Sequence, residues 1–61
     1  MQDQAPTAQF QVTIDYRTSS RLAVWSGMVP APNMEQAGEI AEQLLRRRLR
    51  SLVRVDRIVV R

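Results

Sequence analysis

The sequence of 61 residues contains no cysteine and no histidine. Without them the chain has no disulfide, no thiolate–metal site and none of the commonest catalytic bases and nucleophiles. Its two glycines, Gly27 and Gly38, do not form a glycine-rich phosphate loop. We therefore expect no enzymatic activity, no metal ion or other cofactor, and no small-molecule substrate.

Long apolar runs are absent as well. No stretch approaches the roughly 18 apolar residues of a membrane span, and the N-terminus lacks the features of a signal peptide. This predicts a cytoplasmic protein without a membrane partner. A chain of this length forms one domain, which buries only about 60 % of the surface that its unfolded form exposes. Such marginal burial favours self-association as a source of stability.

Residues 9–17 alternate strictly between apolar and polar side chains. The apolar members are Phe10, Val12, Ile14 and Tyr16. Period-two alternation with β-branched and aromatic residues predicts a strand that is buried on one face. A turn at residues 18–20 then leads into a second strand, from about Arg21 to Val29, which we expect to end before Pro30 and Pro32.

A helix is predicted after Asn33. Asn33 and Gln36 have the spacing of a capping box, in which the asparagine side chain caps the first turn. Apolar residues then recur at helical spacing, at Ala37, Ile40, Ala41, Leu44 and Leu45. Arg48 falls in the middle of this apolar stripe. Either the helix ends near Arg48, or the stem of Arg48 covers the core while its head reaches water.

Residues 52–60 have the composition of a third strand. Their alternation is interrupted at Asp56–Arg57, where we predict a bulge or a register change. The element order predicts a small α+β domain of ββαβ type over residues 9–61, after a flexible N-terminal tail of residues 1–8. A right-handed crossover gives a three-stranded antiparallel or mixed sheet of order 2-1-3, with the helix packed on one face.

The second strand is apolar on both of its faces. We assign the face of Trp25 to the helix, because Trp25 is the largest apolar residue in the chain. The other face carries Leu22, Val24 and Met28, an apolar stripe on the uncovered side of an edge strand. Such a stripe predicts burial by a second copy of the chain in a homo-oligomer. The alternative is that residues 1–8 fold back over it.

Lysine is also absent, so every basic residue is an arginine, and the arginines are unevenly distributed. Residues 1–45 contain two arginines against five acidic residues, a balance of −3, whereas residues 46–61 contain seven against one, a balance of +6. The densest cluster is Arg46, Arg47, Arg48 and Arg50. It is interpreted either as a patch for an anionic partner or as compensation of the helix dipole. An arginine-only composition also arises in a GC-rich genome.

We therefore expect a small non-catalytic protein-interaction module, regulatory or adaptor in kind, that self-associates through its sheet. A partner protein with an acidic surface is expected to bind at Arg46, Arg47, Arg50 and Arg54. The alternative function is nucleic-acid binding by the arginine cluster.

Two other side-chain groups are given structural interpretations. Glu35, Glu39 and Glu42 share one helix face, which indicates a solvated surface rather than a cation site. Tyr16 and Trp25 are assigned to the core rather than to base stacking.

Overall fold

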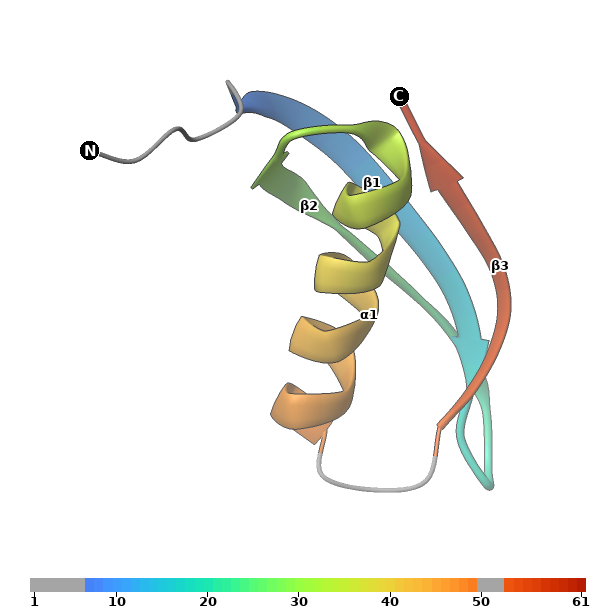
Figure 1. The fold of residues 1–61 in the computed structure, drawn as a ribbon. Helices are drawn as coiled ribbons and strands as arrows, with labels where there is room; N and C mark the ends of the chain where they lie inside the picture. The colour runs from blue at the N-terminus through green and yellow to red at the C-terminus, as the bar shows by residue number, and fades with distance from the viewer. Residues whose placement is uncertain (1–6, 50–52) are drawn as a thin grey trace.

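A computed structural model describes residues 7–49 and 53–61 of the chain. The chain forms strand β1 (Ala8–Arg17), strand β2 (Leu22–Ala31), helix α1 (Met34–Leu49) and strand β3 (Arg54–Val60), as Figure 1 shows. The predicted ββαβ order is confirmed. Most of the predicted tail, residues 1–8, lies outside the described residues, and β1 begins at Ala8.

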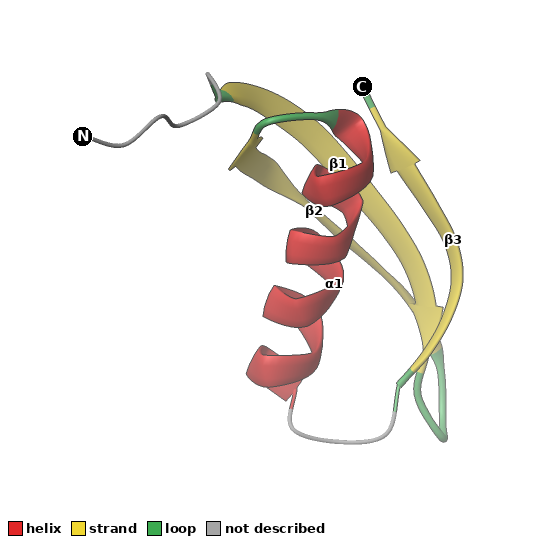
Figure 2. Cartoon of the chain, viewed as in Figure 1, coloured by secondary structure: helices red, strands yellow, loops and turns green. Residues whose placement is uncertain are grey.

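The three strands form one sheet of order β2-β1-β3, and both pairings are antiparallel. Strand β1 is therefore central, as predicted. Helix α1 lies across one face of this sheet, and the opposite face has no helix over it (Figure 2). The β1–β2 register is regular over ten pairs, from Ala8↔Ala31 to Arg17↔Leu22.

The third strand contains the predicted irregularity. Asp15 pairs with Arg57, but the next residue, Tyr16, pairs with Val55, so Asp56 is the extra residue of a β-bulge. The bulge moves Asp56 out of the ladder, so Val55 and Ile58 both pair with the core-facing residues of β1 despite their odd spacing.

The core lies between the helix and the sheet. Its largest fully buried side chains are Val12, Ile14, Val29 and Leu45. Phe10, Tyr16 and Trp25 are partly buried and pack against this cluster. Trp25 therefore faces the helix, as predicted, although part of its ring remains exposed.

The start of α1 confirms the predicted cap. The backbone N–H of Gln36 donates to Oδ1 of Asn33 at 2.8 Å, and the N–H of Ala37 donates to the carbonyl of Asn33 at 3.0 Å. The first bond gives a partner to an N–H that has none within the helix backbone, and the second is the first bond of the helical ladder.

The buried face of α1 differs from the prediction at two positions. Gly38 is buried, whereas Leu44 is 44 % exposed. A Cβ atom at Gly38 would lie 3.6 Å from Cγ2 of Ile58, so this side of the helix lies against β3. The prediction followed the spacing of the apolar side chains and therefore left Gly38 out of the buried face. The centre of the predicted face consequently lay too close to Leu44.

The C-terminal ends of β2 and α1 can also be compared with their predicted limits, and only β2 extends beyond its limit. Strand β2 continues through Pro30, which pairs with Gln9, to Ala31. A proline on an edge strand costs no ladder bond when its nitrogen faces away from the neighbouring strand. Helix α1 continues through Arg48 and ends at Leu49, in agreement with an end near Arg48, and the exposed Arg48 lines a hollow with Trp25 and Leu44.

Candidate interaction surface

The uncovered face of the sheet carries an apolar stripe along β2. Leu22 is 69 % exposed, Val24 is 64 % exposed and Met28 is 59 % exposed. The register places them opposite Arg17, Asp15 and Gln11 of β1, which are polar residues on the same face. The predicted self-association residues therefore lie together on one exposed surface, which we call the β2 stripe.

The backbone of β2 has a free edge, and the hydrogen-bond pattern shows which residues face it. Gln11 exchanges two backbone bonds with Arg61 of the β3 segment, at 3.1 and 2.9 Å, and the N–H of Thr18 donates to the carbonyl of Arg21 at 2.9 Å. In an antiparallel ladder such bonded pairs alternate with unbonded ones. The odd-numbered residues of β1 therefore bond to β3 and the even-numbered ones to β2.

The same alternation fixes the orientation of β2. Its odd-numbered residues, from Ala23 to Val29, bond to β1. The backbone N–H and C=O groups of Leu22, Val24, Ser26 and Met28 point to the free edge. Pro30 belongs to this second set, which is why its missing N–H costs the sheet nothing. The residues of the β2 stripe thus present both apolar side chains and free backbone groups.

The two edges of the sheet differ in their protection. Strand β3 carries a bulge and the charged residues Arg54, Asp56 and Arg57, which are features that discourage pairing with another strand. Strand β2 contains ten residues, has no charged side chain and pairs with β1 without a bulge. Along the free edge of β2, only Pro30, near the C-terminal end of the strand, lacks an N–H group that could pair with another strand.

The predicted arginine site is divided by the fold. Arg46 donates to Oε2 of Glu42 from Nε at 3.1 Å and from Nη2 at 2.9 Å, as expected for residues four positions apart. Its Nη1 also donates to the backbone carbonyl of Val53 at 3.0 Å. Arg46 therefore joins the end of α1 to the residue before β3. The sequence pattern indicated the Glu42 contact but contained no signal for Val53.

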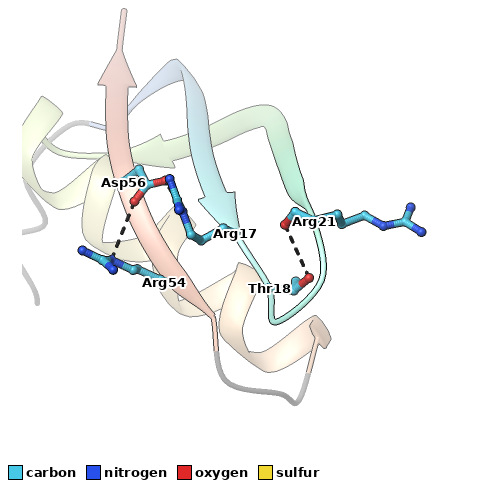
Figure 3. A network of polar contacts seen from close by, with 5 residues as sticks. All are labelled: Arg17, Thr18, Arg21, Arg54 and Asp56. Atoms are coloured by element: carbon cyan, nitrogen blue, oxygen red, sulfur yellow. Dashed lines mark hydrogen bonds and ion pairs between the residues drawn. The ribbon is translucent and has the colours of Figure 1, made fainter.

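Arg54 lies in a second polar group, at the bulge. Nε of Arg17 is 3.1 Å from one carboxylate oxygen of Asp56, and Nε of Arg54 is 3.9 Å from the other, as Figure 3 shows. These side chains are exposed, so each pair stabilises the fold by less than about 1 kcal/mol. Arg50, the remaining member of the predicted site, lies outside the described residues.

Arg47, about 100° around the helix from Arg46, lies on the β2 side of the helix end, whereas Arg46 lies near Val53 on the β3 side. With Arg48, Leu44 and Trp25 it lines a shallow hollow between α1 and β2. Neither Arg47 nor Arg48 forms an ion pair with another described residue. The hollow adjoins the free edge of β2, so exposed apolar groups lie on both sides of that edge.

The remaining candidate residues have structural contacts. Glu42 binds Arg46, and within residues 7–49 and 53–61 no three acidic side chains are close enough together to hold a metal ion. Tyr16 and Trp25 pack on the helix side of the sheet. No helix in the described part of the chain is long and apolar enough to cross a membrane.

Comparisons with protein-family models, with curated protein sequences and with solved structures find no match to this chain. Its function is therefore inferred from the arrangement of its own residues.

Proposed function

We propose that this protein is a small non-catalytic interaction module, regulatory or adaptor in kind, that self-associates through its sheet. The observation that carries the proposal is the β2 stripe. Leu22, Val24 and Met28 are the three most exposed large apolar residues in the described part of the chain, and they share one strand and one face. Single exposed apolar residues are ordinary, but a contiguous group on one strand favours burial against another chain.

The chemistry of the chain supports a binding role over a catalytic one. It has no histidine or cysteine, and its described carboxylates lie on exposed or half-exposed surfaces. The core is built from apolar residues of the strands and the helix, such as Val12, Ile14, Val29 and Leu45. What the fold offers to a partner is the β2 stripe, the free edge beside it and the arginines at the end of α1.

An acidic partner protein is the second ligand we propose, bound near the end of α1. The expected contacts are Arg46, Arg47, Arg50 and Arg54, and Arg47 is the described member of this set that forms no ion pair with another described residue. The nucleic-acid alternative has less support, because Arg46 and Arg54 already lie against Glu42 and Asp56. Fewer arginines are then left for phosphate contacts than the sequence count suggests.

Sedimentation velocity of the Val24→Glu variant tests the self-association. A charge on the β2 stripe has to be desolvated in any interface that covers it, so we expect the variant to remain monomeric where the unmodified chain associates. Gln43→Glu adds the same charge at an exposed position on α1 and is the matched control. Association of the Val24→Glu variant equal to that of Gln43→Glu would contradict the proposal.

A second variant guards against simple unfolding. Replacing Leu22, Val24 and Met28 together by threonine removes the apolar stripe but keeps a residue type that favours strands. Circular dichroism shows whether the fold persists. A folded threonine variant that associates as strongly as the unmodified chain would exclude the β2 stripe as the interface.

A further inference from the structure

The free edge of β2 points to a specific mode of self-association. We propose that β2 pairs antiparallel with β2 of a second copy, so that two three-stranded sheets merge into one continuous sheet. This inference rests on the self-association proposed above and adds its geometry. The competing geometry is a sandwich, in which the uncovered faces of two sheets pack against each other.

The first argument is the contrast between the two edges. Strand β3 is protected by the Asp56 bulge and by charged side chains, whereas β2 presents a regular, uncharged edge. Natural proteins protect edges that remain unpaired, because an open apolar edge is a template for another strand. A sandwich would cover the β2 stripe but leave this edge open. Edge pairing fills the edge and also packs the stripes of the two copies side by side, as cross-strand neighbours on one face.

The second argument is the area that a stable dimer needs. Stable interfaces bury about 800 Å² per partner, roughly a sixth of the 4852 Å² that this chain exposes. Even an aromatic side chain buries only about 150–250 Å², so three partly exposed aliphatic side chains supply about half of that requirement at most. The interface must therefore extend beyond the β2 stripe in one direction.

The two directions differ in their cost. Towards β1 and β3 the interface would bury Asp15, which has no ion pair among the described residues, and Arg57 beside it. Burying such charges carries a large desolvation penalty. Across the free edge it would instead bury backbone groups that gain partners, together with the exposed parts of Trp25 and Leu44. The second direction is the favourable one.

One register satisfies both the donors and the acceptors of all four edge residues, because no carbonyl group of theirs then faces Pro30, which has no N–H. In this register Leu22 lies opposite Met28 of the second copy, and Val24 lies opposite Ser26 of the second copy. All four edge residues then form hydrogen-bonded pairs, and Pro30 lies beyond the paired region. Trp25 then lies opposite Trp25 of the second copy. The two form a pair without backbone hydrogen bonds, on the helix side of the sheet. Each indole ring leans over Gly27 of its own chain, so the two rings lie on opposite sides of the symmetry axis.

Amide hydrogen exchange by NMR at low and high protein concentration tests this geometry. The amides of Leu22, Val24, Ser26 and Met28 should exchange at least about tenfold more slowly in the dimer, because they become hydrogen-bonded. The amides of Ala23, Trp25 and Gly27, which already bond to β1, should be protected at both concentrations. This alternating response along one strand is the signature of edge pairing.

The outcomes separate this inference from the proposal on which it rests. A dimer whose four edge amides still exchange freely would overturn edge pairing and favour the sandwich. A chain that stays monomeric at high concentration would overturn self-association itself, and edge pairing with it.

Replacement of Ser26 by proline gives an independent test. The N–H of Ser26 points away from β1, so Ser26→Pro removes no bond of the monomer but removes one donor from each copy in the dimer. We expect the dissociation constant of the dimer to rise at least about tenfold. Ser26→Thr keeps the donor and should dimerise with the affinity of the unmodified chain. A folded Ser26→Pro chain that dimerises like Ser26→Thr would overturn the inference. If Ser26→Pro does not fold, the exchange pattern of the unmodified chain decides.

Discussion

The indole ring of Trp25 lies over Gly27, two residues further along the same face of β2. A Cβ atom at Gly27 would be 3.0 Å from Cη2 and 3.2 Å from Cζ2 of Trp25, closer than ordinary packing allows. Gly27 therefore makes room for the largest side chain of the protein. Gly38 has a different environment, because a Cβ atom there would lie 3.6 Å from Ile58 and 3.7 Å from Val60, at normal contact distances.

These two glycines should respond oppositely to alanine. Gly38→Ala should raise the free energy of unfolding by about 1 kcal/mol, because alanine favours the helix and its methyl group fits against β3. Gly27→Ala should give no gain or a loss, because the methyl group displaces the Trp25 ring. Urea denaturation of both variants measures the difference. Destabilisation by Gly38→Ala would show that α1 lies closer to Ile58 and Val60 of β3 than these contact distances indicate.

The contact between Arg46 and Val53 leads to a second prediction. Arg46→Gln should lower the free energy of unfolding by about 1 kcal/mol, because it removes the hydrogen bond to the carbonyl of Val53, at the junction of α1 and β3, together with the exposed ion pair to Glu42. The neighbouring substitution Arg47→Gln removes the same charge but no bond to a described residue, and should change stability by less than about 0.5 kcal/mol. If thermal or chemical denaturation gave the same loss of stability for both variants, the loss would come from the missing charge and not from the contacts of Arg46.

Asp56 should limit the binding of polyanions. Asp56→Asn releases Arg17 and Arg54, whereas Asp15→Asn makes the same change in net charge without breaking an ion pair between described residues. At low salt we expect Asp56→Asn to bind duplex DNA more tightly than Asp15→Asn. Its slope of log affinity against log salt should be steeper by up to about two units, since each phosphate contact contributes about 0.9.

Fluorescence titration of labelled DNA at several salt concentrations measures these slopes. The unmodified protein should bind weakly at low salt and lose binding near physiological salt, because Arg17, Arg46 and Arg54 already lie against carboxylates. Tight binding by the unmodified chain at physiological salt would contradict this view and favour the nucleic-acid alternative.

Local signals predicted much of this fold. The change from period two to helical period located β1, β2 and α1, and the Asn33–Gln36 spacing indicated the cap that Oδ1 of Asn33 forms. The broken alternation at Asp56 indicated the bulge. Each of these features depends on residues close together in the sequence, so composition and spacing carry the information.

Other features depend on contacts between distant segments. The burial of Gly38 instead of Leu44 follows from how α1 lies against β3, which no pattern within the helix encodes. The contact of Arg46 with Val53 depends on the path of the chain into β3. The continuation of β2 through Pro30 follows from its position at a sheet edge, and so requires the strand order and the register.

The candidate site was predicted unevenly for the same reason. The exposure of Leu22, Val24 and Met28 followed from strand alternation once Trp25 was assigned to the helix side. The arginines were treated as one cluster because they are close in sequence. In the fold Arg46 lies near Val53, Arg47 lies near Trp25 of β2 and Arg54 lies beside Asp56, so sequence proximity overstated their convergence.

Sedimentation equilibrium of the unmodified chain, from low micromolar to millimolar concentration, tests the central claim most directly. Self-association through β2 predicts that the average mass rises with concentration from that of one chain towards that of two. The threonine variant of the β2 stripe should remain at the mass of one chain over the same range. A constant monomer mass for the unmodified protein up to millimolar concentration would contradict the proposed function.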